Sequence, residues 1–162
     1  MKKIYFLRHA KAKESAKEGD FYRKLSKKGK QDIQLMLERL KNFELKLNCI
    51  ISSPATRTSQ TAREFAQALG CELVFEERLY EAKAKDMINL IKTIDENYQE
   101  IMLVGHNPAL KESIELLSEI HLPSFATCSV LCLELPSFKE LKLHQSRLIF
   151  FENSKNIKEM HL

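Results

Sequence analysis

The chain has 162 residues, of which 44% are hydrophobic and 30% charged, and its formal net charge is +4. This composition excludes a disordered chain, and the length fits one domain spanning residues 1–162. The positions of the four glycines allow neither a GxGxxG dinucleotide loop nor a GxxxxGK phosphate loop. The four cysteines form no CxxC pair, which excludes a four-cysteine zinc site, and we expect neither a metal nor a cofactor.

Apolar runs and cysteines also allow a prediction of the cellular compartment of the protein. The first apolar run, residues 4–7, is too short for a signal peptide or a membrane span. Cysteines without a paired pattern are most simply read as free thiols in a reducing compartment. The sequence therefore predicts a cytoplasmic protein without membrane contact.

Short apolar runs and amphipathic segments alternate along the chain. Strands buried on both faces are expected at residues 4–7, 49–51, 73–75 and 101–104. Helices are expected to begin near Ser26, Ser53, Asp86 and Asn107. The last 40 residues change character, because residues 129–135 and 148–151 read as a hairpin-like antiparallel pair. The pattern predicts a three-layer α/β fold with a mostly parallel central sheet and an antiparallel C-terminal strand.

Polar side chains follow three of the predicted parallel strands. Arg8 and His9 come after the first, Ser53 and Arg57 after the second, and His106 with its neighbour Asn107 after the fourth. An open α/β sheet places its ligands beyond the carboxyl ends of its strands. We therefore expect two histidines and two arginines to meet at one edge of the sheet.

Such a cluster suits phosphate. Two guanidinium groups bind phosphoryl oxygens with a bidentate geometry that lysine does not reproduce, and helix N-termini after Ser53 and Asn107 add N–H donors. A neutral imidazole can attack phosphorus, while a second, protonated histidine would stabilise the charge that develops on the phosphoryl group. This chemistry requires no metal.

Three segments carry a resemblance to a known family. Residues 7–10 (LRHA), 53–62 (SPATRTSQTA) and 104–108 (VGHNP) resemble, in order, the three motifs of the histidine phosphatase superfamily, also called phosphoglycerate mutase-like. Within it, the short length and residues 23–29 (RKLSKKG) are most similar to SixA-type phosphohistidine phosphatases. The resemblance implies the phosphoglycerate mutase-like fold and a phosphorylated histidine as enzyme intermediate.

The resemblance also implies roles for individual residues. His9 would be the nucleophile, with Arg8, Arg57 and His106 completing the phosphate pocket and Arg23 as a further phosphate or substrate contact. Ser53 and Asn107 are expected to help bind substrate. Glu81 is the carboxylate that best matches the family's general acid; the alternatives are an ordinary exposed glutamate, or a reaction that needs no dedicated acid.

Two departures from the family pattern concern the first motif and the segment that follows it. Ala10 stands where the family usually has glycine, which narrows the backbone approach beside the nucleophile. Lys24 stands where SixA-type enzymes have proline, so the loop there loses a rigid residue. Only 48 residues separate Arg57 from His106, too few for a large lid. The pocket is therefore expected to be open and shallow.

Positive charge is concentrated at the N-terminus. Residues 1–30 hold 11 basic and 3 acidic side chains, a net +8, whereas residues 31–162 are net −4. A basic rim would steer an anionic phosphoprotein toward the pocket. We predict a metal-independent phosphohistidine phosphatase whose partner is a phosphorylated protein and not a nucleic acid. The alternatives are a phosphatase for small phosphate monoesters and, in another class, a non-catalytic anion- or nucleic-acid-binding module.

Overall fold

The computed structural model describes residues 1–155, which fold around one six-stranded sheet. The strands, in chain order, are β1 (Lys2–Arg8), β2 (Cys49–Ser52), β3 (Glu72–Phe75), β4 (Glu100–Gly105), β5 (Val130–Leu135) and β6 (Arg147–Glu152). Their order across the sheet is β3-β2-β4-β1-β5-β6, with β1 to β4 mutually parallel and β5 antiparallel to both of its neighbours. The predicted mixed sheet is confirmed.

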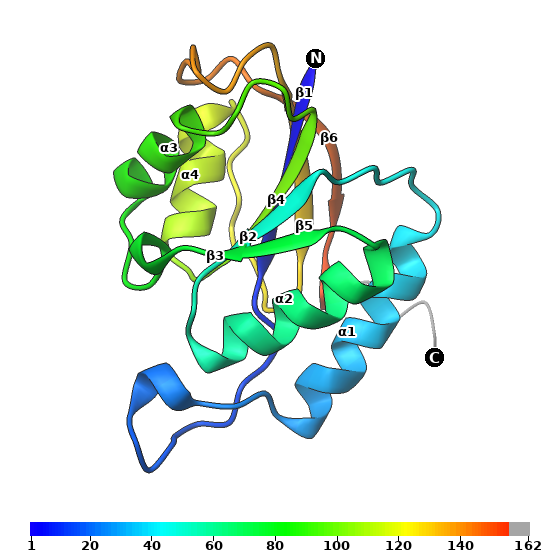
Figure 1. The fold of residues 1–162 in the computed structure, drawn as a ribbon, viewed down its shortest axis with the longest axis vertical. Helices are drawn as coiled ribbons and strands as arrows, with labels where there is room; N and C mark the ends of the chain where they lie inside the picture. The colour runs from blue at the N-terminus through cyan, green and yellow to red at the C-terminus, as the bar shows by residue number, and fades with distance from the viewer. Residues whose placement is uncertain (156–162) are drawn as a thin grey trace.

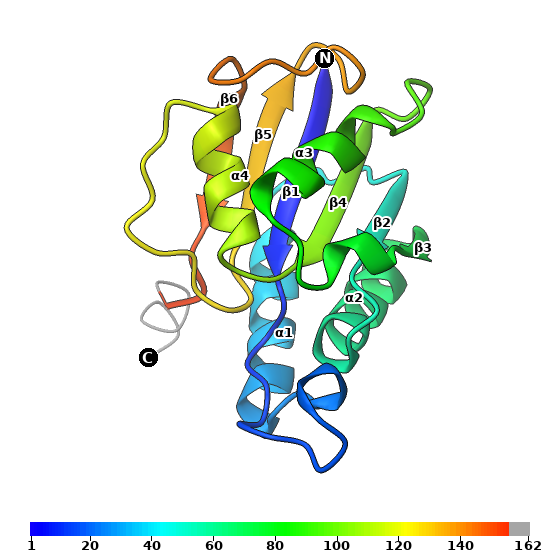
Figure 2. The same ribbon diagram turned by 90° about the vertical axis from the view of Figure 1, so that its left-hand side faces the viewer.

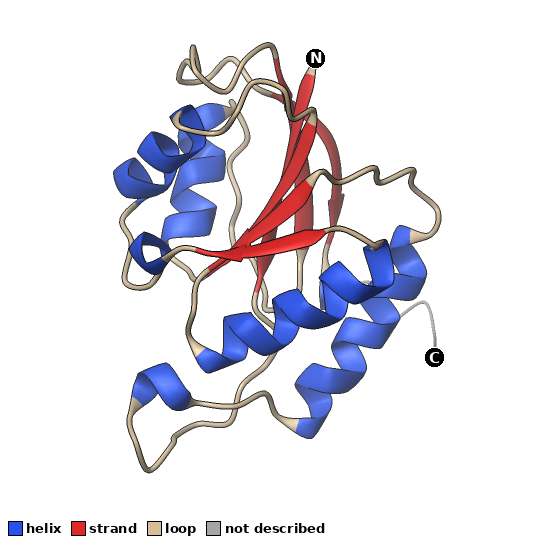
Figure 3. Ribbon diagram, viewed as in Figure 1, coloured by secondary structure: helices blue, strands red, loops and turns tan. Residues whose placement is uncertain are grey.

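Four helices cover the sheet in two layers (Figures 1 and 3). On one face lie α1 (Lys27–Leu40) and α2 (Thr56–Leu69), and on the other α3 (Ala84–Lys92) and α4 (Ala109–Leu117). Two short 3₁₀ turns, η1 (Asp20–Tyr22) and η2 (Glu77–Leu79), complete the described elements. The three-layer α/β architecture is the one expected from the sequence.

The central strand β1 shows why the layers form. Ile4 and Phe6 pack into the apolar cluster under α3 and α4, whereas Tyr5 and Leu7 pack into the cluster under α1 and α2. All four side chains are at most 1% exposed. Burying a large apolar side chain contributes about 1.5–3 kcal/mol, so a strand that is apolar on both faces is stable only between two helix layers.

Two helix boundaries follow the predicted signals. Ser26 caps α1, since its hydroxyl accepts a hydrogen bond from the Gly29 amide at 3.0 Å. Gly70 ends α2 with a left-handed backbone at φ 66°. Both residues have the roles that their types favour.

Three predicted helix starts are wrong by two or three residues. α2 begins at Thr56 and not next to Ser53, whose hydroxyl is instead hydrogen-bonded to a histidine ring described below. α3 begins before Asp86, which lies inside the first turn and accepts a hydrogen bond from the Lys83 amide at 2.9 Å. α4 begins after Pro108 rather than at Asn107.

The carboxyl ends of β1 and β4 are neighbours in the sheet, with Arg8 opposite Gly105. Two irregular segments flank this edge. The strap, residues 10–26, connects β1 to α1, and the 118–129 loop connects α4 to β5 (Figure 2). In the part of the chain that the structure describes, no helix is both long and apolar enough to cross a bilayer.

Candidate active site

Two histidines lie side by side at the carboxyl edge of the central strands. His9 follows β1 and His106 follows β4, and the His9 amide donates to the Gly105 carbonyl at 3.2 Å. The two imidazole centroids are 5.3 Å apart, with the rings inclined by 55°. The sheet thus brings together two residues that are 97 positions apart in the sequence, as the strand-end argument predicts.

His9 is held as a neutral imidazole. Its side chain is buried, with 8% of the residue exposed, and Nδ1 donates to the Ala10 carbonyl at 2.8 Å. Burial lowers the pKa of His9 to about 3, with the charges of His106, Arg8 and Arg57 acting in the same direction. At neutral pH the proton therefore stays on Nδ1, and the lone pair of Nε2 is free to act as a nucleophile.

His106 is also neutral in the unliganded site. Its Nδ1 accepts a hydrogen bond from Arg57 Nη2 at 3.3 Å, and its Nε2 donates to Ser53 Oγ at 2.8 Å. Burial, together with the charge of Arg57, lowers the pKa of His106 to about 4. The protonated second histidine expected from the sequence is absent at neutral pH until an anion enters the site.

Arg57 is held from the strap side. Its Nη1 donates to the Asp20 carbonyl at 2.9 Å, and its Nη2 lies 3.2 Å from Asp20 Oδ2. The same carboxylate oxygen accepts a hydrogen bond from the Tyr80 hydroxyl at 2.8 Å. The Tyr80 hydrogen bond, with Arg23 and Arg57, lowers the pKa of Asp20 to about 2. Sequence reasoning missed Asp20 and Tyr80, because neither comes directly after the end of a strand.

Arg8 and Asn107 are held from the opposite side by a single backbone carbonyl. Arg8 Nη1 donates to the Phe125 carbonyl at 3.1 Å, and Asn107 Nδ2 donates to the same oxygen at 2.8 Å. Burial and the nearby charge of Arg57 lower the pKa of the Arg8 guanidinium. The two arginines therefore repel each other across the histidine pair, an arrangement that an anion between them would relieve.

The alanine that follows the nucleophile fits its surroundings. Ala10 is fully buried in the apolar cluster under α1 and α2, and its amide donates to Thr61 Oγ1 at 3.1 Å. The Thr61 hydroxyl in turn donates to the Arg57 carbonyl at 2.8 Å. Thr61 thus ties the segment after His9 to the first turn of α2, and the methyl group of Ala10 packs inward.

Two other candidate residues lie farther from the histidine pair. Arg23 braces the strap, with Nε donating to the Lys13 carbonyl at 2.8 Å and Nη1 donating to Asp20 Oδ1 at 3.1 Å. Glu81 is exposed and has a left-handed backbone at φ 58°. Its neighbour Tyr80 meets the His106 ring edge-on, with centroids 5.7 Å apart. Arg23 is therefore linked to Arg57 through Asp20, which contacts both arginines. Glu81 is the chain neighbour of Tyr80, whose ring contacts His106.

The donors around the histidine pair suit an anion. Within residues 1–155, no three histidine, cysteine, aspartate or glutamate side chains gather as metal ligands. Arg8 Nε, Arg57 Nε and Asn107 Oδ1 are buried without a hydrogen-bond partner in the described structure. Unsatisfied buried donors are costly, and a phosphoryl group placed between the guanidinium groups would offer several acceptor oxygens.

Known proteins share this fold and these motifs. Residues 4–120 match the histidine phosphatase superfamily (branch 1). The probable phosphoglycerate mutase GpmB of Escherichia coli (strain K12 / DH10B) is 32% identical over 112 residues, which are 65% of this chain and 51% of GpmB. The chain thus spans about half the length of this curated relative.

Solved structures match along almost the whole chain. A candidate phosphohistidine phosphatase SixA from Agrobacterium tumefaciens is 29% identical, with a TM-score of 0.82 over 93% of this chain and 97% of that one. A protein histidine phosphatase SixA complexed with tungstate is 18% identical, with a TM-score of 0.84 over 96% and 99%. A phosphoserine phosphatase from Entamoeba histolytica has a TM-score of 0.64 at 17% identity, with coverage of 96% and 98%.

Proposed function

Because the chain belongs to the histidine phosphatase superfamily, whose chemistry is phosphoryl hydrolysis or transfer, we propose that it is a metal-independent phosphohistidine phosphatase. Its substrate would be phosphohistidine on a signalling or phosphotransfer protein. The observation that carries the proposal is the neutral, buried His9 lying 5.3 Å from His106 between two arginines. Within the proposal, residues 1–162 act as one catalytic domain in the cytoplasm.

The first step transfers the phosphoryl group to the enzyme. His9 Nε2 attacks phosphorus, an N–P bond forms, and the N–P bond to the substrate imidazole breaks. The leaving nitrogen takes up a proton from solvent or from Glu81. Arg8 and Arg57 hold the phosphoryl oxygens, and their charge stabilises the transition state. The Nδ1 hydrogen bond to the Ala10 carbonyl keeps the attacking nitrogen unprotonated.

The second step releases inorganic phosphate. Water attacks the phosphorus of phosphorylated His9, the enzyme's N–P bond breaks, and Nε2 regains its lone pair. The water proton goes to the phosphate or to solvent. His106, once an anion raises its pKa, donates a hydrogen bond to a phosphoryl oxygen in both steps.

The shape of the mouth supports a protein substrate. The chain between Arg57 and His106 forms α2, β3, η2, α3 and the central strand β4, and the apolar faces of α2 and α3 are buried in the core. None of these elements is available as a lid over the histidine pair. An unlidded site admits a phosphorylated side chain carried by a macromolecule.

The experiment compares substrates and a nucleophile variant. Wild type is expected to hydrolyse a phosphohistidine protein with kcat/KM orders of magnitude above that for sugar phosphates, and chelator is expected to leave the rate unchanged. Wild type should also form an acid-labile phosphoenzyme that His9→Ala does not form. The matched control is His121→Ala, because that imidazole is 86% exposed and far along the chain. Activity that survives His9→Ala, or a preference for sugar phosphates, contradicts the proposal.

A further inference from the structure

A cavity lies beside Arg8 and Asn107, on the side of the 118–129 loop. Its volume is about 360 Å³. Its walls include Arg8 and Asn107 from the site already described, and six further residues: Lys111, Ser124, Phe125, Ala126, Thr127 and Lys155. The cavity therefore shares two side chains, Arg8 and Asn107, with the candidate active site.

Arg8 and Asn107, the two residues that the cavity shares with the candidate active site, carry polar atoms without hydrogen-bond partners within residues 1–155. The Phe125 carbonyl accepts hydrogen bonds from both Arg8 and Asn107, which fixes these two side chains next to each other. Even so, Arg8 Nε and Asn107 Oδ1 have no partner among the described residues. One is a donor and the other an acceptor, so a ligand with an anionic oxygen and an N–H or O–H group matches both.

The charge of the cavity has one sign. Arg8, Lys111 and Lys155 supply three cationic groups to its lining, and none of the lining residues within 1–155 carries a carboxylate. Glu115, whose Oε1 lies 3.5 Å from Lys111 Nζ on the next turn of α4, is not among the lining residues. Ser124 and Thr127 add hydroxyl groups. Such a lining selects a small anion.

We propose that this cavity is a carboxylate subsite, in which Lys111, Lys155 and Arg8 bind an acidic group carried by the same substrate that places its phosphoryl group at His9. The inference rests on the proposed function and adds a substrate class to it. The carboxylate belongs to an aspartate or glutamate next to the phosphohistidine.

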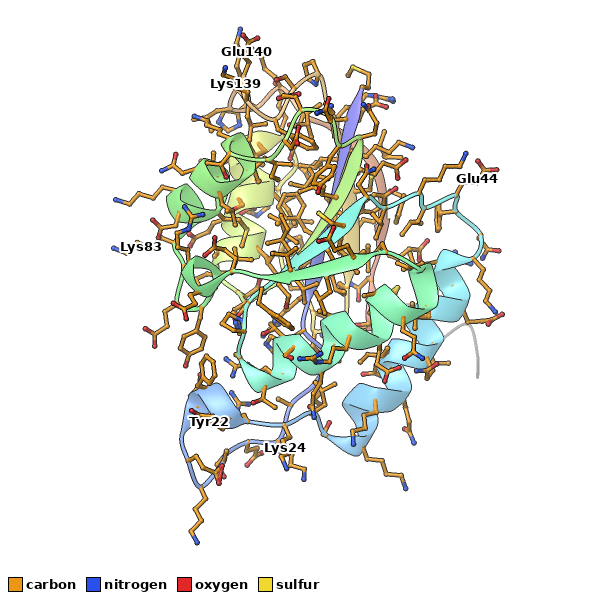
Figure 4. The ribbon with its side chains drawn as sticks, viewed as in Figure 1. Tyr22, Lys24, Glu44, Lys83, Lys139 and Glu140 are labelled. Atoms are coloured by element: carbon orange, nitrogen blue, oxygen red, sulfur yellow. The ribbon has the colours of Figure 1, made fainter. Side chains whose placement is uncertain are left out.

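The test measures a preference between matched substrates. The two substrates are phosphohistidine peptides that differ only by glutamate or glutamine beside the phosphohistidine. Wild type is expected to favour the glutamate peptide about tenfold in kcat/KM. Lys111→Ala and Lys155→Ala are each expected to reduce this ratio severalfold, and the double variant to bring it near one. Lys139→Ala is the control, because Lys139 lies at the end of the molecule opposite Tyr22 and Lys24 of the strap (Figure 4).

The outcomes separate the two proposals. A preference for the glutamate peptide that is present in wild type and lost in the double variant supports the subsite. Hydrolysis of phosphoimidazole without any acidic preference overturns the subsite and leaves the proposed function standing. A preference that survives in the double variant also overturns it. An enzyme that hydrolyses neither phosphoimidazole nor the peptides fails the proposed function, and the subsite falls with it.

Discussion

The two sides of the histidine pair hold their arginines by different chemistry. On the strap side, Arg57 is bound by the carboxylate and carbonyl of Asp20. On the side of the 118–129 loop, Arg8 is bound by the neutral carbonyl of Phe125. A carboxylate offsets positive charge and competes with a phosphoryl group, whereas a carbonyl does neither. The uncompensated positive charge of the site therefore lies at Arg8.

Lysine substitutions at the two arginines compare the two sides directly, and of the changes predicted in this comparison they are expected to have the largest effect on kcat/KM. Arg8→Lys should lower kcat/KM about 10³-fold and Arg57→Lys about 10²-fold, since lysine loses the bidentate geometry at both positions but only Arg8 lacks a carboxylate partner. Steady-state kinetics on a phosphohistidine peptide measures both values. Thermal unfolding confirms that each variant is folded. Equal losses would show that Asp20 does not offset the charge of Arg57.

The next prediction concerns the two histidines and the pH dependence of the free energy of unfolding. Their pKa values in the folded protein, about 3 for His9 and about 4 for His106, lie below the ordinary value of 6.5. Below pH 6.5 the unfolded chain therefore binds more protons, and the free energy of unfolding falls as the pH decreases toward these folded pKa values. We expect each histidine to contribute a loss of about 2 kcal/mol between pH 7 and pH 5.

Denaturant unfolding at several pH values measures this loss. His9→Gln should remove about half of the pH dependence. A slope that is the same in His9→Gln and wild type would mean that His9 titrates normally in the folded protein.

The anchoring of the strap can be broken at one glycine. A Cβ at Gly29 would overlap the backbone carbonyl oxygen of Lys11, which also accepts a hydrogen bond from the Ser26 amide at 2.9 Å. Gly29→Ala should therefore cost about 2 kcal/mol of stability and speed amide exchange in the strap more than in the 118–129 loop. Gly105→Ala is the control for stability, because the nearest atom, Met87 Cε, lies 3.5 Å from its Cβ position. Uniform exchange in both segments would contradict a local effect.

The smallest effect concerns the carboxylate itself. Asp20→Asn should tighten binding of inorganic phosphate two- to fivefold, because the Asp20 side chain is 54% exposed and ion pairs at such positions are weak. It should also lower the pKa of His106 further, since Asp20 raises it, without moving that of His9. Calorimetry and histidine NMR measure the two changes. Weaker phosphate binding would show that the main effect of Asp20 is to position Arg57 for phosphate, and not to compete with phosphate for the guanidinium group.

The sequence predicts the sheet edge well because periodicity and strand ends are local signals. Apolar runs mark β1 and β4, and the residues after them, His9 and His106, meet because parallel strands end on the same side. Nothing comparable marks the strap, where Asp20 reaches Arg57 through an irregular path of the chain.

Backbone groups and shared hydroxyls also escape sequence reasoning. The Phe125 carbonyl binds two side chains, yet a carbonyl is present at every residue, so no residue type signals it. Ser53 is a residue type that favours helix N-caps. Its hydroxyl is hydrogen-bonded to His106, however, and α2 starts at Thr56. A tertiary contact overrides a local preference at this position.

The pairing of Arg8 with Gly105 in the ladder between β1 and β4 has a consequence for how this scaffold can vary. The separation of the two imidazoles is set by neighbouring strands, whose spacing is a constant of the peptide backbone. Insertions in the strap or in the 118–129 loop leave that spacing untouched. The spacing of the two imidazoles is therefore independent of both loops, whereas the positions of the two arginines are not. A designer who exchanges either loop would have to keep the Asp20 contact to Arg57 and the Phe125 carbonyl contact to Arg8.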